Sequence, residues 1–526
     1  MAESTVPVLI VGGGMAGLSC AAFLGLHGVR ALLVERHAGT SIEPRAIGQH
    51  PRTLEHLYPL GVVEEIRTSP GVRCDNWRIV VGEGFGGAEL ESRQPQLDVS
   101  DLSPVGWGTA TQQQIEPILR RSAVTHGARL MFRTELVSYE QRRDDVTAVL
   151  RDLRTGAERT VRARYLVAAD GHRATIRRAE GVGTHSVHER WNRVLHHSLN
   201  IVFDADLSSV VPSSEALLYY LRRDDIARTF VTTEFPDRHV LGVEAAAPLP
   251  TAECVDIVRA VVGIPDLPVR VVSQHTWQMA AFVADRYRVG RVLFVGDSAH
   301  VIPPTGGWGG NTAIGDAAEL SWKLAAQVRG EANDTLLDSY EAERRPVAEA
   351  LVGQSLRNYV TRIAPHEGLD GLPPDTDPVA LTFGFRYRSS AVADDGPELP
   401  DPPDHRRVFD PGQVAGVPGA RAPYVRLGGG RSTLDVFGRD WVLLCGDDRW
   451  NVTVPGVRAY RVAGPQQQRQ RQRQRFTQAY RIDADGAALV RPDGVLAWKS
   501  VHAVDEPAAR VATVLDHLLT GRYDRR

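Results

Sequence analysis

The sequence has 526 residues, is 43% hydrophobic and carries a formal net charge of −3 at pH 7, which excludes a strongly basic nucleic-acid-binding protein and a largely disordered chain. Its length is enough for about two to four domains. Its four cysteines are far apart and none forms a C-x-x-C pair, so we expect no metal site and no dithiol chemistry, and unpaired thiols fit a cytoplasmic protein.

The N-terminal residues 6–35 predict a strand, a tight turn, a helix and a second strand. The apolar run at 6–11 is followed at once by a G-x-G-x-x-G motif, an apolar helical pattern and a strand that ends in Glu35. The run at 8–29 carries no formal charge, but its glycines are clustered and no basic residue precedes it. We therefore expect neither a membrane span nor a signal peptide here.

Each position of this motif suits a bound dinucleotide. Gly12 permits the turn, Gly14 lets backbone N–H groups approach a pyrophosphate, and Gly17 lets the helix pack closely on the strand. Glu35 can accept a hydrogen bond from a ribose hydroxyl. The alternative is a glycine-rich turn in an unrelated α/β fold. A second G-x-G-x-x-G at 82–87 has no apolar helix after it and is interpreted as a loop, so only one classical dinucleotide site is expected.

A second glycine-rich stretch follows another apolar run, in "VLFVGDSAHVIPPTGGWGGN". Asp297 stands at the end of this predicted strand, where it suits either a hydroxylated ligand or a helix cap. The two prolines limit the conformations of the loop, and its glycines let backbone N–H groups come close to a charged ring. A helix is expected from Asn311 to Gly330. His300 could act as a base, but a packed structural histidine is favoured.

The order of the first G-x-G-x-x-G, then Asp170-Gly171, then "GDSAHVIPPTGG" resembles the single-component FAD-dependent aromatic hydroxylases, the p-hydroxybenzoate hydroxylase class. The segments "ERHAGTSIEPRAIGQHPRTLEHL", "GFRYRSSAV" and "ALVRPDGVLAWKS" are most similar to the polyketide-tailoring members, the aklavinone hydroxylases among them. The resemblance implies an α/β fold in three parts. They are a Rossmann-like FAD-binding domain (1-73, 104-178 and 282-395), an inserted antiparallel-sheet substrate domain (74-103 and 179-281) and a thioredoxin-like C-terminal domain without C-x-x-C (396-526).

The same resemblance implies a monooxygenase with non-covalent FAD and with NADPH or NADH as co-substrate. Reduced FAD and molecular oxygen would form a C4a-hydroperoxide that hydroxylates a phenolic, polycyclic aromatic polyketide. Baeyer–Villiger oxygen insertion and a non-catalytic flavin- or drug-binding protein remain alternatives, and a flavin halogenase is disfavoured because the sequence has no W-x-W pair. Neither nucleic acid nor a membrane is expected as a partner, and the oligomeric state stays open.

The motifs and the resemblance together assign cofactor contacts position by position. Asp297 would hold the ribityl chain, Gln112 would reach the same polar chain, and Asp170 would serve both FAD and NADPH. The family usually has serine where Ala174 stands, which departs from the pattern. The full set assigned to the cofactor is Gly12, Gly14, Met15, Ala16, Gly17, Glu35, Arg36, Arg45, Gln112, Asp170, Asp297, Pro304, Gly306, Gly307, Gly309, Gly310 and Asn311.

Residues 179–281 contain short runs with period-two alternation, which predict an antiparallel sheet with one face over the flavin. Trp308, in the flavin loop, can cap the flavin, touch the substrate or face outward. Arg386 and Arg388 could lower the pKa of a bound phenol by their charge, which makes them the candidate catalytic residues. The candidate pocket residues on the sheet, each with ordinary core packing as an equal alternative, are Tyr219, Phe230, Trp277 and Met279.

The C-terminal part begins after a proline cluster at 396–405, which predicts a linker. Strands are expected in "STLDVFGRDWVLLCG", "VRAYRV" and "ALVRPDGVLAWKS", and a helix in "PAARVATVLDHLLTG". Cys445 is interpreted as a buried small hydrophobic residue. The basic, low-complexity segment Pro465–Arg475 is expected to be a disordered surface loop, with binding of an anionic partner as the alternative.

Overall fold

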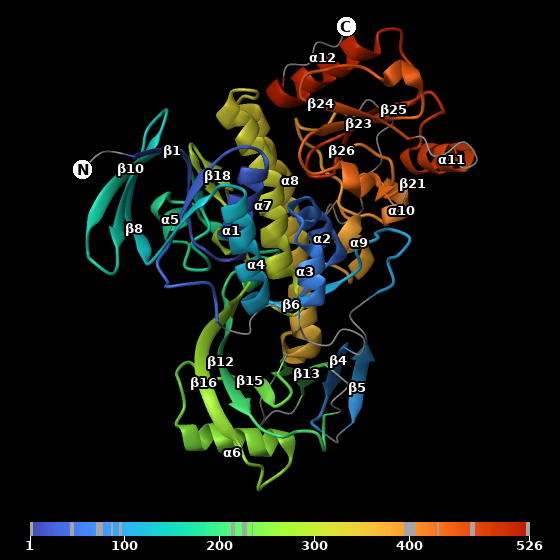
Figure 1. The fold of residues 1–526 in the computed structure, drawn as a ribbon. Helices are drawn as coiled ribbons and strands as arrows, with labels where there is room; N and C mark the ends of the chain where they lie inside the picture. The colour runs from blue at the N-terminus through green and yellow to red at the C-terminus, as the bar shows by residue number, and fades with distance from the viewer. Residues whose placement is uncertain are drawn as a thin grey trace.

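The computed structural model describes residues 4–42, 47–69, 77–85, 88–93, 97–211, 216–222, 229–233, 235–393, 407–428, 431–462 and 469–521. Arg45 and the proline cluster at 396–405 lie outside these ranges, so the expectations for them stay predictions. Figure 1 shows a central α/β region, with one sheet below it and the C-terminal region above it. Within the described ranges, no helix is both long and apolar enough to cross a membrane.

The central sheet has the strand order β18-β19-β10-β1-β2-β7, and its inner strands are parallel. The apolar run in β1 is buried on both faces, as parallel sheets covered by helices require. Helix α1 packs against both α4 and α7. The bounds are β1 (Ser4–Val11), α1 (Met15–Leu26), β2 (Ala31–Glu35), α4 (Gln112–Thr125), β7 (Arg129–Phe132), β8 (Thr134–Gln141), β9 (Val146–Asp152), β10 (Glu158–Ala168), β18 (Arg288–Val289), β19 (Val292–Phe294) and α7 (Trp308–Arg329).

The second sheet has the order β16-β12-β15-β14-β13-β4-β5, and helix α6 lies under it (Figure 1). Its pairs are antiparallel as expected, except that β13 and β4 run parallel where two separate parts of the chain meet. The sequence interpretation did not include α6. The bounds are β4 (Trp77–Gly82), β5 (Glu89–Arg93), β12 (Val194–Asp204), β13 (Ala216–Leu221), β14 (Thr229–Thr232), β15 (Arg238–Glu244), α6 (Thr251–Val262) and β16 (Arg270–Ala280).

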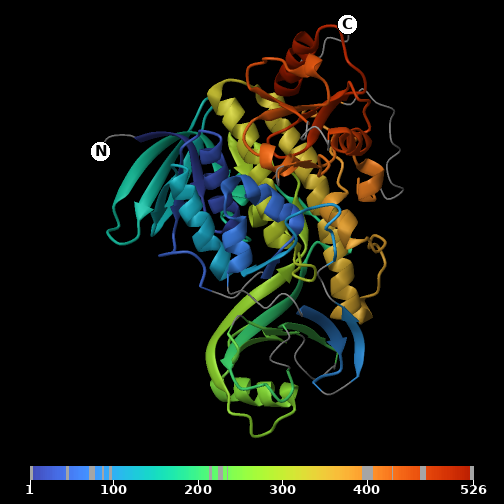
Figure 2. The same ribbon diagram turned by 45° about the vertical axis from the view of Figure 1, so that its right-hand side comes forward.

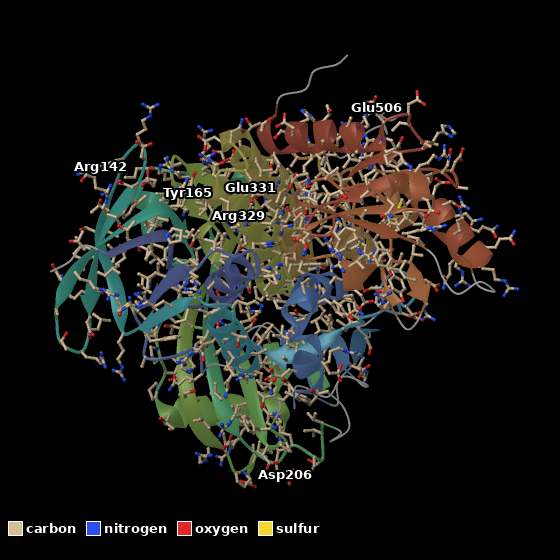
Figure 3. The ribbon with its side chains drawn as sticks, turned by 45° about the horizontal axis from the view of Figure 1, so that its top comes forward. Arg142, Tyr165, Asp206, Arg329, Glu331 and Glu506 are labelled. Atoms are coloured by element: carbon tan, nitrogen blue, oxygen red, sulfur yellow. The ribbon has the colours of Figure 1, made fainter. Side chains whose placement is uncertain are left out.

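Helix α8 (Asp334–Arg362) spans 29 residues and connects the three regions, because it runs from the C-terminal region to the second sheet (Figure 2). Figure 3 places Asp206 of the lower region and Glu506 of the upper region at opposite ends of the molecule. At the end of α7, Arg329 donates to the carbonyl of His27 at 2.6 Å and pairs with Glu331 at 2.6 Å, which ties α7 to the end of α1.

The C-terminal region is a sheet of order β24-β23-β25-β26 with helices beside it. The expected strands and final helix are present, whereas Thr433–Val436 is a 3-10 helix rather than a strand. Its thioredoxin-like character stays a prediction. The bounds are β21 (Arg426–Gly428), β22 (Arg431–Ser432), β23 (Trp441–Cys445), β24 (Val457–Arg461), α11 (Arg469–Tyr480), β25 (Ala487–Val490), β26 (Leu496–Ser500) and α12 (Pro507–Thr520).

Two sequence expectations are wrong in their local structure. Of the segment Pro465–Arg475, expected to be disordered, residues 469–475 form the first half of α11, which is anchored by the fully buried Phe476 and Tyr480, and residues 465–468 lie outside the described ranges. Helix α7 starts at Trp308 rather than Asn311, because Gly307 takes a left-handed φ of 69° and caps it. The remaining short elements are β3 (Ile47–Gln49), α2 (Pro51–Leu57), α3 (Val63–Thr68), β6 (Gly108–Thr111), α5 (Thr175–Ala179), β11 (Thr184–His185), β17 (Phe282–Ala284), β20 (His300–Val301), α9 (Pro378–Phe383) and α10 (Pro411–Val414).

Candidate active site

The first glycine motif leaves the N-terminus of α1 bare. A Cβ on Gly17 would lie 2.0 Å from the carbonyl oxygen of Gly12, so only glycine lets α1 pack this closely on the turn. A Cβ on Gly14, the N-cap residue, would meet nothing nearer than Glu116 Oε1 at 3.7 Å. Met15 and Ala16 form the first turn, where Glu116 accepts from the N–H of Met15 and the helix N-terminus borders this open space. The geometry therefore fits a pyrophosphate.

Glu35 lies at the end of β2, beside this turn. Its carboxylate accepts from the N–H of Gly13 at 2.6 Å and from the N–H of His37 at 2.7 Å. Both contacts fix the carboxylate next to the helix N-terminus, where a ribose hydroxyl can reach it. The neighbouring Arg36 is exposed.

The sequence interpretation missed a buried acid at this point, Glu116 on α4. Its Oε1 accepts from Gln112 Nε2 at 2.7 Å, its Oε2 accepts from the N–H of Ser41 at 2.7 Å, and the side chain is buried. Burial raises the pKa of Glu116, and the charge of Glu35 raises it further. Gln112 lies beside the start of α1 and part of its amide is engaged by Glu116, while its contact with the cofactor stays a prediction. The i, i+4 spacing of the two residues was the available signal.

Two further acids reach the same edge of the central sheet, because β10 and β19 are parallel neighbours. Asp170 follows β10 and accepts from Ser298 Oγ at 2.7 Å and from the N–H of Ile176 at 3.0 Å. Asp297 follows β19 in a 3-10 turn (Gly296–Ser298) and is exposed. The structure therefore brings the glycine turn, Asp170 and Asp297 together at one edge.

The flavin loop links this edge to the N-terminus of α7. The N–H groups of Gly306 and Gly307 both donate to the carbonyl of Pro304, at 2.8 and 3.2 Å, which closes a tight turn. A Cβ on Gly309 would meet no atom within 4 Å, so the loop faces open space there, next to Gly310. Asn311 is engaged elsewhere: its Oδ1 accepts from the N–H of His50 at 2.9 Å. A helix N-terminus beside bare glycines suits the negative end of a reduced flavin.

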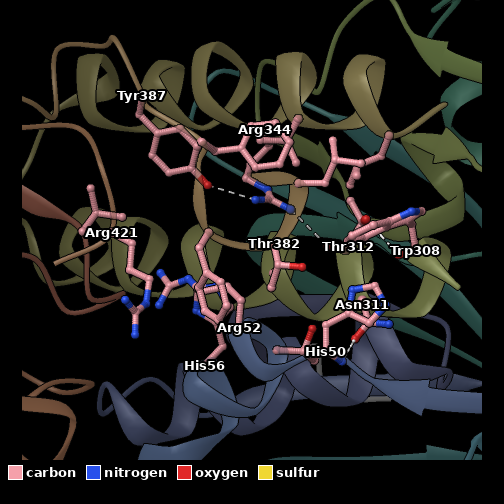
Figure 4. Close-up of a pocket in the computed structure, with 18 of the residues that line it drawn as sticks. His50, Arg52, His56, Trp308, Asn311, Thr312, Arg344, Thr382, Tyr387 and Arg421 are labelled. Atoms are coloured by element: carbon pink, nitrogen blue, oxygen red, sulfur yellow. Dashed lines mark hydrogen bonds between the residues drawn. The ribbon is translucent and has the colours of Figure 1, made fainter. Parts of the chain in front are cut away.

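Trp308 faces into the protein. Its side chain is buried, and a Cβ on Gly306 would lie 2.5 Å from the indole, so the loop folds onto its own tryptophan. The ring of His50 meets the indole edge-on with centroids 4.2 Å apart, and burial lowers the pKa of His50 to about 3. The indole and Asn311 line a cavity behind the loop (Figure 4).

The two faces of the second sheet pack in two different hydrophobic clusters. Tyr219 and Phe230 pack in the cluster under the sheet, against α6, and the Tyr219 hydroxyl donates to the carbonyl of Gly84 at 2.9 Å. Met279 and Trp277 belong to the main core on the opposite face. Of the four candidate pocket residues, only Met279 and Trp277 therefore face the flavin region. Trp277 Nε1 donates to Asn200 Oδ1 at 3.0 Å, a contact that the sequence interpretation missed.

Arg362, at the end of α8, joins the flavin loop to the second sheet. Its Nη1 donates to the carbonyl of Thr305 at 3.0 Å, and its guanidinium carbon lies 5.8 Å from the centroid of the Tyr220 ring. Asn358 also donates to the Thr305 carbonyl, at 2.8 Å. Arg362 is 4% exposed, yet no carboxylate in the described ranges pairs with it. A buried guanidinium without an acid is costly and suggests an anionic ligand.

The arginines predicted to be catalytic lie in a different place. Arg386 is buried, and its Nε donates to the carbonyl of Pro418 at 3.1 Å; its backbone bridges to Ala420. Arg388 is half-buried in the same segment. Arg386 therefore faces the C-terminal region, and a catalytic role for either residue stays a prediction.

Behind the site, α7 and α8 share a buried charge network. His300 Nε2 lies 2.7 Å from Asp316 Oδ2, which fits the packed structural histidine favoured from the sequence. Lys323 Nζ pairs with Glu343 at 2.6 Å, and Arg491 of the C-terminal region pairs with Glu343 at 2.7 Å. Among the described residues, no group of histidine, cysteine and acidic side chains could hold a metal ion.

Comparisons with known proteins agree with this geometry. Residues 5–355 match the model of an FAD binding domain family, and residues 415–521 match the model of the aromatic-ring hydroxylase C-terminal region. The chain is 44% identical over 463 residues to aklavinone 12-hydroxylase DnrF of Streptomyces peucetius, covering 84% of this chain and 92% of that protein. It is 38% identical to aklavinone 12-hydroxylase RdmE of Streptomyces purpurascens over the full length of both.

A solved structure gives the same result for the fold. The crystal structure of a ternary complex of aklavinone-11 hydroxylase with FAD and aklavinone superposes with a TM-score of 0.88 at 36% identity, covering 99% of this chain and 100% of that one.

Proposed function

Because the chain belongs to the FAD-binding aromatic-ring hydroxylases, it is a flavoprotein monooxygenase that uses FAD and NAD(P)H, and we propose that its substrate is a phenolic, polycyclic aromatic polyketide. The observation that carries the substrate assignment is the buried Arg362, which lies between the flavin loop and the second sheet and has no carboxylate partner among the described residues. The names of the aklavinone hydroxylases support the same substrate class. We further propose a cytoplasmic location, molecular oxygen as the second substrate, and the three-part division of the chain predicted above.

The residues at the sheet edge fit FAD. The N–H groups at the start of α1 would hold the pyrophosphate, Asp297 would accept from the hydroxylated chain, and the N-terminus of α7 would face the ring. When bound and reduced by NAD(P)H, FAD supplies the oxygen chemistry of the reaction. The protein therefore has to position the substrate ring, exclude water and control the charge on the substrate.

Arg362 is the group that would control this charge. A buried cation next to a phenol stabilises the phenolate and lowers the phenol pKa, and a phenolate ring is richer in electrons and reacts faster with an electrophilic oxygen. The Thr305 carbonyl and the Tyr220 ring hold the guanidinium in place. Trp277 and Asn200 would form the polar floor of the same site.

Turnover with a panel of aromatic polyketides tests this function. We expect a phenolic polycyclic compound to stimulate NAD(P)H oxidation, and its product to gain one oxygen atom derived from labelled molecular oxygen. Consumption of NAD(P)H without an oxygenated product from any phenolic polyketide would contradict the substrate assignment.

The pH dependence of turnover tests the role of Arg362. Arg362→Gln should move the pH at which turnover rises to a higher value, because the phenol loses its cationic neighbour, and Arg362→Lys should restore part of the shift. Arg357→Gln, on the same helix but bonded to the carbonyl of Pro373, is the matched control and should keep the wild-type profile. An unchanged profile in Arg362→Gln, or the same shift in both glutamine variants, would rule out this role.

A further inference from the structure

A cavity lies behind the flavin loop, between the FAD-binding and C-terminal regions (Figure 4). It begins at Trp308 and Asn311, follows α7 past Gly315, and reaches Arg421 of the C-terminal region. About 70 Å³ is open to the centres of water-sized molecules, which is room for several waters or a small organic ion. The cofactor edge ends at the N-terminus of α7, so this cavity starts where the expected flavin site stops.

The charged side chains that line the cavity are all arginines. Arg52 and Arg421 share one acid behind the wall, Glu55, whose Oε2 accepts from Arg52 Nη1 at 3.1 Å and from Arg421 Nε at 2.7 Å. Two guanidinium groups and one carboxylate leave this corner with one excess positive charge. At the other side, Arg344 donates to the Tyr387 hydroxyl at 3.0 Å and to the carbonyl of Thr312 at 3.2 Å (Figure 4).

His56, on α2, adds an unpaired hydrogen-bonding group to the corner with excess charge. It is 8% exposed and lines both this cavity and a smaller one beside it. Burial, together with the charges of Arg52 and the two other arginines, holds its pKa well below the usual value, so the imidazole is neutral. A neutral imidazole has one N–H donor and one acceptor, and neither has a hydrogen-bond partner among the described residues. Buried polar groups of this kind are normally satisfied.

We propose that this cavity binds a small organic monocarboxylate, held by His56, Arg52 and Arg421 between the FAD-binding and C-terminal regions. The carboxylate balances the excess charge and accepts from the imidazole N–H and the free edges of the guanidinium groups. The lining also includes the apolar side chains Leu351 and Phe383, the latter with its ring centroid 4.9 Å from the guanidinium carbon of Arg421, and these side chains take a short aliphatic tail. The site is separate from the proposed hydroxylation and does not depend on it.

Ligand-dependent unfolding of the FAD-loaded protein tests the site. Sodium acetate, sodium propionate and sodium chloride are compared at constant ionic strength, with a bulky sulfonate buffer as the balancing anion. A ligand that binds only the native state raises the thermal midpoint with saturation, and the curve gives an apparent Kd. We expect saturable stabilisation by acetate and propionate, and about one acetate bound per chain in equilibrium dialysis.

The variants separate this site from a general salt effect. His56→Leu should weaken the apparent acetate Kd about tenfold or more, which corresponds to one lost hydrogen bond to a charged group. His239→Leu removes a buried histidine from the core under the second sheet and should keep the wild-type Kd. Val347→Phe fills the cavity from α8 and should abolish acetate binding, which also tests the proposal where His56→Leu does not fold.

Three outcomes would overturn the proposal. The first is that neither acetate nor propionate raises the thermal midpoint with saturation. The second is equal acetate affinity in the wild type and in Val347→Phe. The third is saturable stabilisation by chloride and none by the two carboxylates. The last outcome would assign the cavity to an inorganic anion instead.

Discussion

Gly14 and Gly17 belong to one motif, but the structure predicts different effects when each becomes alanine. In Gly17→Ala the new Cβ would lie 2.0 Å from the carbonyl oxygen of Gly12, where contacts under 3.0 Å are essentially never found. Helix α1 must therefore shift by about 1 Å, at a cost of about 1–3 kcal/mol. Gly14 has φ −82° and ψ −172°, which alanine adopts readily, and the nearest atom to its Cβ, Glu116 Oε1, is 3.7 Å away. In Gly14→Ala, weaker capping lowers the free energy of unfolding and a less flexible unfolded chain raises it. The two effects roughly offset, so the free energy of unfolding should change by less than about 1 kcal/mol.

Urea unfolding of the flavin-free protein and quenching of FAD fluorescence separate the two effects. Gly14→Ala should keep the unfolding midpoint but bind FAD about tenfold more weakly or worse, because its methyl group stands where the pyrophosphate approaches. Gly17→Ala should lower both stability and affinity. Gly39→Ala, on an open loop with no atom within 4 Å of its Cβ, is the control and should change neither. Full FAD affinity in Gly14→Ala, or an unchanged midpoint in Gly17→Ala, would refute this reasoning.

Three more variants test other parts of the structure. Burial raises the pKa of Glu116, and a neighbouring pyrophosphate raises it further, so FAD binding should take up a proton and weaken as the pH rises. Glu116→Gln should flatten this pH dependence of FAD affinity in fluorescence titrations. An unchanged slope of affinity against pH would disprove the coupling. Phe476→Ala should lower the free energy of unfolding by about 3–5 kcal/mol, whereas the exposed Arg471→Ala should stay within about 0.5 kcal/mol; equal effects would mean that α11 is not anchored. Glu343→Gln should lower the free energy of unfolding by about 3–5 kcal/mol, because the buried Lys323 and Arg491 lose their shared partner. A thermal midpoint equal to that of the wild type would contradict this.

The cofactor half of the site could be predicted because its signals are local. The turn at Gly12, the acid at the end of β2 and the loop before α7 each combine glycines with a strand end, and this chemistry is visible within about 20 residues of sequence. Parallel strands then bring separate segments to one edge without further information. Even here the start of α7 was placed three residues late, because the left-handed conformation of Gly307 was not visible in the helical pattern.

The substrate half could not be predicted to the same depth, because it depends on which sheet face meets the flavin. Alternation in β13 shows that Tyr219 and Tyr220 point to opposite faces, but it does not say which face α6 covers. Arg362 lies in the unremarkable run "NYVTRIA" at the end of a long helix, and only the tertiary fold brings it to Thr305. Arg386 was selected for its sequence neighbourhood and instead contacts the C-terminal region.

The basic segment before Phe476 shows why a prediction of disorder from composition alone was wrong. A run of glutamine and arginine has little apolar surface, which is typical of disordered chains. The two aromatic residues that anchor it come directly after the run, one helical turn apart, and they pack beneath β23 and β25 in the C-terminal core. The spacing of these aromatic residues and the helix propensity of the run were the relevant signals. Both become visible only when the sequence window extends past the glutamine- and arginine-rich run.

The C-terminal region has no dithiol motif, and its contacts explain how it can still matter for catalysis. Asp493 accepts from Trp322 Nε1 of α7 at 2.8 Å, and its backbone carbonyl accepts from Arg52 of α2 at 2.9 Å, while Arg491 pairs with Glu343 of α8. One hairpin therefore contacts the three helices that surround the rear of the flavin loop. Buried ion pairs add little net stability, because desolvation offsets their attraction, but a misplaced partner is costly. Such a network favours one arrangement of α2, α7 and α8 over all others, and the position of the N-terminus of α7 follows from that arrangement.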